Sequence, residues 1–181
     1  MHQSGGIRGC GDSRERTGRW LEDGFPKIGW KFAGIEDYGE EGLLCQMCGH
    51  AKRRFLHVMT HDEVPEVLAL GLQCAELLEQ DWYRPAKRER RYEDDLRVRK
   101  DWPGKRWKLS SQGNSYVNVR EFNITIWDKG GAGFGVTIKL QNKFDGSFEI
   151  NGKKLYRTLE EAKAGALVAF IYARKKFASL E

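Results

Sequence analysis

The chain has 181 residues, of which 40% are hydrophobic and 31% charged, with four cysteines and a formal net charge of +5. This length fits one domain of ordinary size or two small ones, and the hydrophobic share excludes a wholly disordered chain. The sequence has no run of the roughly 18 apolar residues that a membrane-spanning helix needs, and no apolar core of a secretory signal near its start. We therefore expect a soluble, cytoplasmic protein without a membrane partner, in which clustered cysteines bind metal more often than they form disulfides.

The charge is divided unevenly along the chain. Residues 1–80 hold 9 Lys and Arg against 13 Asp and Glu, whereas residues 81–110 hold 11 against 6 and residues 111–181 hold 11 against 7. An acidic first part and a basic remainder favour a polyanionic partner for the remainder.

Four segments follow from the pattern of residues. Residues 1–18 are rich in Gly, Ser and Arg and predict a flexible tail. Residues 19–84 predict a small domain with a helix at 74–80 and three short strands, at 29–35, 54–61 and 66–70, the last two joined by a turn at 62–65.

Residues 85–110 predict a basic helical linker. Three pairs of opposite charge stand four residues apart, as they do along one face of a helix: Arg90 with Asp94, Glu93 with Arg97, and Asp95 with Arg99. The segment has too few large apolar side chains to bury a face, so we expect a solvated helix that ends at Pro103-Gly104.

Residues 111–181 predict an antiparallel sheet covered by one helix. Apolar and polar residues alternate at 122–127 and again at 134–140, on either side of a glycine-rich hairpin loop. Thr158 and Glu161 have the spacing of a capping box, and an apolar stripe follows them at helical spacing. The fold class we predict is α+β: a small zinc domain, the basic linker, and a three-stranded antiparallel sheet with one packed helix.

Three cysteines have the spacing of a metal site. Cys45 and Cys48 enclose two residues, which lets two thiolates approach one ion from a tight turn, and Gly49 follows where such a turn needs a positive φ. Cys74 stands at the predicted start of a helix, where backbone amides stabilise a thiolate. A turn, a strand hairpin and a helix that returns a ligand form a treble-clef-like arrangement, and we predict structural Zn²⁺ in it.

A histidine is the expected fourth ligand. Pairing of the strands at 54–61 and 66–70 places His57 opposite residue 70, close to the strand end that leads to Cys74. We therefore predict His57, with His61 as the alternative and His50 as the third choice. Cys10 lies in the predicted tail and is expected to be a free thiol.

The positions of the histidines in the sequence argue against a catalytic metal site. A treble-clef nuclease needs a second His or Asn on the helix after the strand, and the chain has no histidine between Cys74 and its last residue. A thiolate-rich zinc site is usually closed to substrate. We expect no catalytic residues and no small-molecule substrate, and a metal-dependent nuclease is the least favoured function.

The segments WKFAGIEDYGEEGLLCQMCG, FLHVMTH, VLALGLQCAELL, WKLSSQGNSYVNV and YRTLEEAKAGALVAF resemble a set of uncharacterised bacterial and phage proteins over about residues 28–175. The relatives often carry a second cysteine at the position of Leu72, so its absence makes a histidine ligand more necessary here. The resemblance implies the zinc module and the sheet-plus-helix domain but no activity.

Residues 111–181 are also similar, more loosely, to the sheet-plus-helix DNA-binding domains of ethylene-response factors and integrase arms. That resemblance implies that the exposed sheet face enters the major groove, and aromatic and basic residues interleaved on a sheet suit stacking and phosphate contact. The residues that we expect to touch nucleic acid are Arg88, Arg91, Arg97, Arg99, Lys100, Lys105, Arg106, Lys108, Arg120, Trp127 and Lys139.

The leading hypothesis is therefore a non-catalytic, zinc-stabilised nucleic-acid-binding protein of phage or mobile-element type, with DNA favoured over RNA. The alternative is an adaptor that engages a host protein, since Trp82, Trp102 and Trp107 are candidates for exposed tryptophans and tryptophan is favoured in interfaces.

Overall fold

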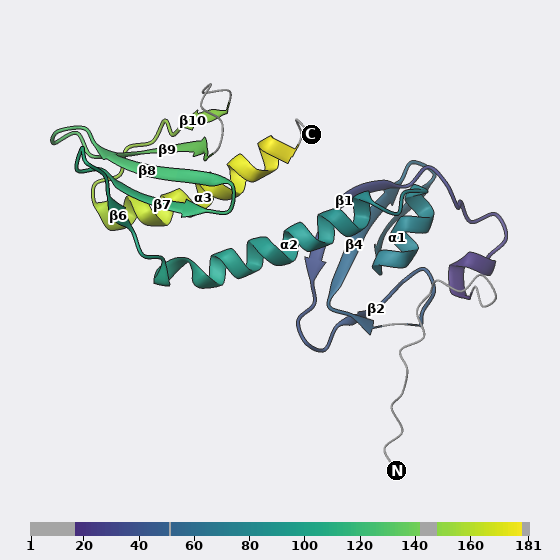
Figure 1. Cartoon of the computed structure of the whole chain (residues 1–181). Coiled ribbons are helices and arrows are strands. Elements are labelled where there is room, and N and C mark those ends of the chain that lie inside the picture. Colours follow the sequence, from purple (N-terminus) through teal and green to yellow (C-terminus); the bar gives the residue numbers. More distant parts are fainter. Residues whose placement is uncertain (1–16, 51, 142–147, 179–181) are drawn as a thin grey trace, which may run out of the picture. The chain divides into compact units, whose positions relative to one another are not determined.

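The computed structural model describes residues 17–50, 52–141 and 148–178 (Figure 1). The chain divides into two compact units, Met1–Asp94 and Asp95–Glu181, which we call unit 1 and unit 2. The boundary falls inside one helix, α2 (Arg84–Asp101), so each unit includes one part of that helix. The predicted flexible tail, apart from its last two residues, lies outside the described residues.

Unit 1 is built on a three-stranded antiparallel sheet in the order β1-β4-β5, with β2 and β3 as a separate two-stranded ribbon. Helix α1 packs against β4. The elements are a 3₁₀ helix at Gly18–Leu21, β1 (Lys31–Asp37), β2 (Leu43–Leu44), β3 (Lys52–Arg53), β4 (Phe55–His61), β5 (Val64–Leu70) and α1 (Leu72–Glu79). The strands and the helix expected from the sequence are present, each shifted by a few residues.

The pairing of β4 with β5 has the predicted register. His57 lies opposite Leu70, and the two strands close at His61 and Val64. Leu70 leads directly into Gly71 and then into α1, so the end of β5 and the first turn of α1 form one continuous support for Cys74.

The loop from Cys45 to Cys48 is fastened to the edge of this sheet. The backbone N–H of Gln46 donates to the carbonyl of Ala69, and the N–H of Ala69 donates to the Gln46 side-chain oxygen. Gly49 has a φ of +71° and donates its N–H to the Cys45 carbonyl, as the predicted tight turn requires. The loop is therefore held in place by backbone bonds as well as by its cysteines.

Unit 2 contains a five-stranded antiparallel sheet in the order β10-β9-β8-β7-β6 (Figure 1). Its elements are β6 (Lys108–Leu109), β7 (Ser115–Val119), β8 (Phe122–Asp128), β9 (Phe134–Leu140), β10 (Glu149–Asn151) and α3 (Leu159–Ala178). The predicted sheet had three strands. The two additional edge strands, β6 and β10, have only two and three residues, too few to produce a readable alternation of apolar and polar residues.

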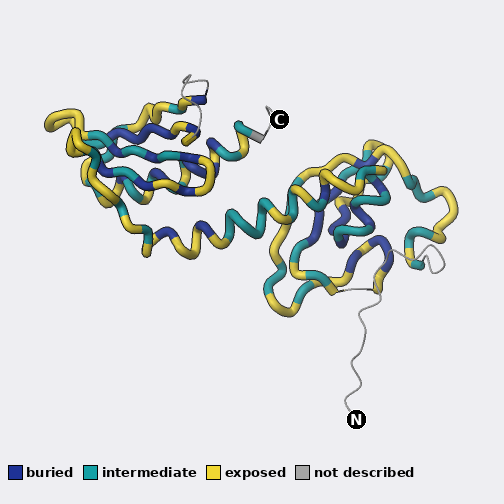
Figure 2. Tube along the Cα trace, in the orientation of Figure 1, coloured by how far each residue is buried: buried dark blue, intermediate teal, exposed yellow. Residues whose placement is uncertain are grey.

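Helix α3 covers one face of this sheet. Phe122, Ile124 and Ile126 of β8 are fully buried or nearly so, and they belong to one core with Ala166 and Phe170 of α3. Figure 2 shows the buried stretches along the strands of this sheet. Thr158 accepts the N–H of Glu161, which confirms the predicted N-cap, while the Glu161 carboxylate accepts the N–H of Arg157. The predicted apolar stripe of α3 is thus its buried face.

The second half of α2 is not a solvated linker. Val98 is buried, and so is Trp102 in the 3₁₀ turn Trp102–Gly104; both belong to the core of unit 2 (Figure 2). The Trp102 indole N–H donates to the carbonyl of Lys163 in α3 at 2.8 Å. One buried valine and one buried tryptophan, separated by a turn of helix, are enough to anchor it, although the charged residues around them dominate the sequence.

Among the described residues, no helix combines the length and the apolar character that crossing a membrane requires.

Candidate metal centre and sheet face

The predicted cysteines meet in unit 1. The sulfur atoms of Cys45, Cys48 and Cys74 all lie within 4.8 Å of one another, and all three residues are buried. The loop from Cys45 to Cys48, which we call the knuckle loop, supplies the first two, and the first turn of α1 supplies the third. Residues far apart in the sequence therefore present three thiols to one point, which is the arrangement of a metal site.

Backbone amides make Cys45 a strong thiolate candidate. A hydrogen bond from the Cys74 thiol, together with the N–H groups of Cys48, Gly71 and Met47, lowers the pKa of Cys45 to about 5, although burial opposes this. The Cys74 thiol, as the donor of that bond, has a raised pKa because it is buried beside the negative charge of Cys45. Two neighbouring buried thiolates repel each other. A divalent cation would offset that repulsion, so that all three sulfurs can be thiolates.

The segment before the first strand also touches the site. The Trp20 indole N–H donates to Cys74 Sγ at 3.4 Å, and the Thr17 hydroxyl donates to the Cys48 carbonyl at 2.8 Å. Arg19 donates its backbone N–H to the Met47 carbonyl. The sequence did not indicate this role for residues 17–20, because a single tryptophan in a polar segment has no periodicity.

The donor set fits zinc. Three thiolates at a knuckle and a helix start match the soft ligands and the short spacing of structural zinc sites, and N–H groups directed at the sulfurs stabilise their negative charge. No His, Asp or Glu of the described residues joins the three sulfurs within the same 4.8 Å.

The predicted histidines lie elsewhere. His57 is fully buried, and its Nε2 pairs with Glu89 Oε2 of α2 at 2.9 Å. His61 Nε2 bonds the Ile28 carbonyl at 3.0 Å, and His50 Nδ1 lies 2.6 Å from the Thr17 hydroxyl. His57 lies opposite Leu70, as predicted. Cys74, however, is four residues beyond Leu70, and the imidazole is not part of the sulfur cluster.

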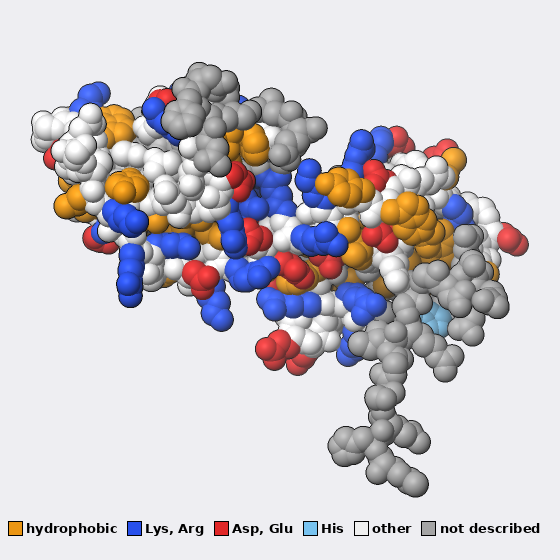
Figure 3. All heavy atoms as spheres, viewed as in Figure 1, with side chains coloured by type: hydrophobic (Ala, Val, Ile, Leu, Met, Phe, Trp, Pro, Cys, Tyr) orange, Lys and Arg blue, Asp and Glu red, His pale blue; other side chains and the backbone are white. Residues whose placement is uncertain are grey.

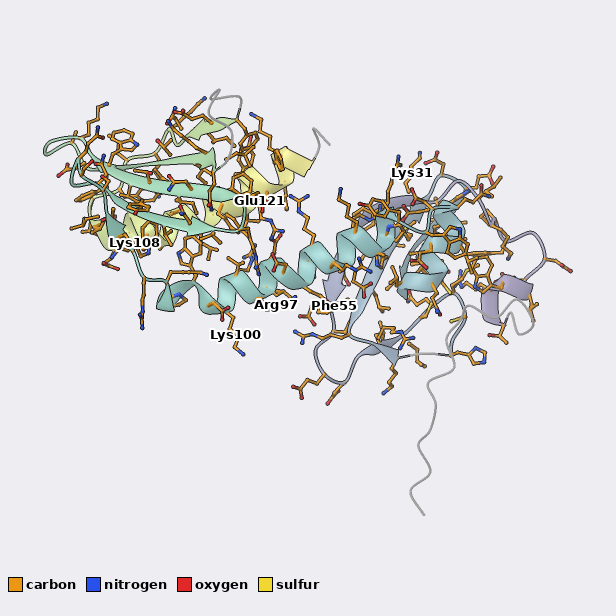
Figure 4. The ribbon with its side chains drawn as sticks, in the orientation of Figure 1. Lys31, Phe55, Arg97, Lys100, Lys108 and Glu121 are labelled. Atoms are coloured by element: carbon orange, nitrogen blue, oxygen red, sulfur yellow. The ribbon has the colours of Figure 1, made fainter. Side chains whose placement is uncertain are left out.

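His57 and Glu89 form a pair between β4 and the first half of α2, in which the histidine is fully buried and the Glu89 side chain is 21% exposed. The His57 Nδ1 atom is buried and has no hydrogen-bond partner among the described residues. The centre of the Phe32 ring lies 6.0 Å from that of the imidazole. The centre of the Phe55 ring, labelled in Figure 4, lies 5.7 Å from that of Tyr92 in α2. This pair fixes the position of the Glu89 side chain, which in the sequence is one of many charges along a predicted helix.

A pocket adjoins the cysteines. Its volume is about 350 Å³, and two of the three metal-ligand candidates form part of its wall. The lining residues are Cys45, Arg53, Phe55, Gly71, Leu72, Gln73, Cys74 and Glu89. The lining of the pocket thus includes two almost fully buried cysteines, one cation, one carboxylate and apolar side chains.

In unit 2 the predicted polar sheet face is present on the side opposite α3. Trp127 of β8 lies against Gly135 of β9, where an added Cβ atom would come within 2.2 Å of the indole. The Trp127 indole N–H donates to the Thr137 hydroxyl at 2.9 Å. The indole is therefore held flat over a residue that has no side chain, and it is half-buried.

Uncharged polar side chains surround this indole. Thr137 donates to Asn151 at 2.6 Å, and Asn123 joins Asn118 at 2.8 Å and Thr125 at 2.9 Å. Lys139 is exposed but forms an ion pair with Glu149 at 2.8 Å. The face is thus rich in amides and hydroxyls, and its lysine is already paired.

The basic residues predicted to contact nucleic acid divide between the units. Arg88 and Arg91 belong to unit 1; Arg88 pairs with Glu79, and its guanidinium lies 3.8 Å from the centre of the Phe32 ring. The others are residues of unit 2. Lys105 is half-buried there, and the exposed residues are Arg97, Arg99, Lys100, Arg106, Lys108, Arg120 and Lys139, of which Lys139 is paired with Glu149. Arg97, Lys100 and Lys108 are labelled in Figure 4.

The two units differ in charge. Residues 95–181 carry 17 Lys and Arg against 9 Asp and Glu, a net +8, whereas residues 1–94 carry 14 against 17, a net −3. Figure 3 shows Lys and Arg side chains on the second half of α2 and on unit 2, between larger areas of uncharged side chains. The basic excess of the chain is therefore a property of unit 2.

The predicted exposed tryptophans have three different environments. Trp82 is 65% exposed, and its neighbour Tyr83 is 68% exposed. Trp102 is buried, and Trp107 packs against the same core, its ring 6.2 Å from that of Trp102. Only the first of the three thus offers its side chain to a partner.

The chain was compared with protein-family models, with curated proteins and with solved structures, and none of the three comparisons found a match.

Proposed function

We propose that the protein is a zinc-stabilised nucleic-acid-binding protein, in which unit 1 holds structural zinc and unit 2 binds the nucleic acid. The observation that carries the binding role is the indole of Trp127, held flat over Gly135 on a polar sheet face of a unit with a net charge of +8. We further propose that the knuckle loop, the β4-β5 hairpin and α1 form a treble-clef arrangement around the metal.

The zinc would stabilise the folded state of unit 1. Unit 1 has a small core that includes the three cysteines, and the bond energy of a structural zinc is available only to the folded chain. Cys45, Cys48 and Cys74 would hold the ion, and the N–H groups of Gly71 and Trp20 would orient and stabilise their sulfurs. No chemical step is required of the metal in this role.

Nucleic acid would bind unit 2 through two kinds of contact. A base can stack on the exposed face of the Trp127 indole, which is worth about 1–3 kcal/mol per base. Asn118, Asn123 and Thr125 offer donors and acceptors to base edges or sugars on the same face. The exposed cations of unit 2 neutralise phosphates, and the duplex DNA of the leading hypothesis is the first substrate to test.

Fluorescence anisotropy of the zinc-loaded full chain with labelled single-stranded and duplex DNA and RNA tests this proposal. At 50 mM and at 200 mM salt we expect saturable binding that weakens steeply with salt. The variant Trp127→Ala should weaken binding about tenfold, which corresponds to the loss of one stacked base. Trp82→Ala, which changes an exposed tryptophan of unit 1, is the matched control and should bind as the parent does. Absence of binding to all four probes at 50 mM salt would refute the proposal.

A second candidate is a protein-interaction adaptor, favoured by the exposed pair of Trp82 and Tyr83 next to the start of α2. Adjacent exposed aromatic side chains are typical of interface hot spots. A pull-down with the full chain in the presence of nuclease would support this function if one protein partner is retained by the parent and lost from Trp82→Ala.

A further inference from the structure

We propose that the polar sheet face of unit 2 binds single-stranded nucleic acid, with two neighbouring bases stacked on the side chains of Trp127 and Tyr116. This inference rests on the nucleic-acid binding proposed above, and it adds the class of nucleic acid and a second aromatic residue to that site. Single strands of DNA and of RNA present the same kinds of base and phosphate to this face.

A second aromatic residue lies on the same face as Trp127. Tyr116 of β7 is paired with Thr125 of β8, and Trp127 follows Thr125 by two residues on the same strand. Residues paired across two antiparallel strands, and residues two apart along one strand, have their side chains on the same face of the sheet. Tyr116 and Trp127 are therefore diagonal neighbours on the polar face, and both are half-buried.

The spacing of these two residues suits a single strand and not a duplex. Diagonal neighbours on a sheet face lie about 7–8 Å apart. Successive nucleotides in one strand of B-DNA rise by only about 3.4 Å, and the base faces are enclosed in the stack. A duplex therefore cannot place one base on each residue, whereas the unstacked bases of a single strand can be splayed far enough apart to do so.

The Trp127 indole is fixed within the sheet before any base binds. Its N–H donates to the Thr137 hydroxyl at 2.9 Å. Thr137 donates in turn to Asn151 at 2.6 Å, and Asn151 donates to Glu149 at 2.9 Å. Because the indole N–H is used within the sheet, a base is bound at Trp127 by stacking alone, which every base can provide. The fixed ring also lowers the entropy cost of binding.

The charges on this face favour phosphate at one edge of the sheet. Lys108 of β6, labelled in Figure 4, is exposed and is paired in the sheet with Tyr116, on the side of β7 away from β8. Towards the opposite edge, Lys139 forms an ion pair with Glu149 at 2.8 Å, so these two side chains add no net charge. We therefore expect Lys108 to contact the phosphate next to the base on Tyr116.

Fluorescence anisotropy of the purified full chain tests this inference with three probes of one sequence that does not pair with itself. The probes are single-stranded DNA, single-stranded RNA and duplex DNA, each titrated at about 50 mM salt. We expect at least one single strand to bind about tenfold tighter than the duplex, the effect of one additional stacked base.

Substitutions separate stacking from general attraction to a polyanion. Tyr116→Leu keeps an apolar side chain on β7 without a ring and should weaken single-strand binding about tenfold, whereas Tyr116→Phe should bind as the parent does. Tyr172→Leu changes an exposed tyrosine of α3, beyond the other face of the sheet, and is the matched control. Lys108→Met should reduce the slope of log affinity against log salt by about 0.7, and Lys175→Met, an exposed cation of α3, should leave it unchanged.

Photochemical crosslinking of the parent provides a measurement that needs no variant. A single strand that contains iodouracil should form adducts with Trp127 and Tyr116, which mass spectrometry can locate. Adducts on neither residue would overturn the inference.

The outcomes distinguish this inference from the function on which it rests. Duplex DNA bound at least as tightly as both single strands would overturn the inference and leave nucleic-acid binding in place. A folded Tyr116→Leu variant with the affinity of the parent, or an equal loss of affinity in Tyr172→Leu, would do the same. Absence of binding to all three probes would refute the proposed function together with this inference.

Discussion

At the scale of single residues, the hydrogen bonds to the Cys45 sulfur explain why the site forms only when its loop is packed against the end of β5. The sulfur receives N–H groups from its own loop and from Gly71 at the end of β5, so the site is complete only when the loop is fastened to the sheet. Metal binding and the local fold of unit 1 are therefore expected to be coupled.

A substitution of His57 distinguishes two roles for this residue, a metal ligand and a buried structural partner of Glu89. In His57→Leu the Glu89 carboxylate loses its partner, and we expect the free energy of unfolding to fall by about 2–4 kcal/mol. The metal content of the folded protein should be unchanged, as measured by elemental analysis beside a urea titration. A folded variant that has lost its metal would contradict the assignment of His57 to the pair with Glu89.

Gly135 gives a second prediction at this scale. In Gly135→Val the side chain would occupy the place of the Trp127 indole, so the indole must leave the sheet face. We expect a loss of about 1–3 kcal/mol of stability and weaker nucleic-acid binding, measured by denaturation and anisotropy. Gly104→Ala is the control, since a Cβ there meets no atom within 4 Å. Unchanged affinity in a folded Gly135→Val variant would exclude the indole as the stacking surface.

At the scale of elements, the start of α3 depends on a side-chain cap. The Thr158 hydroxyl accepts the Glu161 N–H at 3.1 Å, and Thr158→Ala should therefore cost about 1 kcal/mol of stability. Thr158→Ser keeps the hydroxyl and should restore most of it. Urea titrations of both variants measure the difference, and equal stability of the alanine and serine variants would rule out a role for the cap.

The elements also show which parts of the fold could be predicted from the sequence. β8, β9 and α3 were predictable because each buries one face over several turns or pleats, which leaves a period in the sequence. β6 and β10 are too short for a period, and the burial of α2 depends on Val98 and Trp102 alone. The three cysteines could be grouped from their spacing. The bond from Trp20 and the pairing of His57 with Glu89 could not, because they join segments whose approach only the folded backbone determines.

At the scale of the whole molecule, the two units have different sources of stability. Unit 2 has an extensive aromatic and aliphatic core, whereas unit 1 has a smaller core, and the three cysteines are among its buried members. If unit 1 holds the proposed zinc, its removal with a chelator should therefore abolish amide protection in the knuckle loop and α1 while leaving that of β8, β9 and α3 intact. Hydrogen exchange of the full chain, resolved by mass spectrometry, measures both units in one sample. Protection lost equally in both units would contradict separate stabilisation.

The metal content of the purified full chain tests the central claim most directly. Elemental analysis of protein expressed with zinc present should give one zinc per chain for the parent and a marked loss for Cys74→Ser, while Cys10→Ser retains the metal. A folded parent chain that contains no zinc, or a Cys74→Ser variant that keeps all of it, would contradict the claim that these three cysteines hold a structural ion.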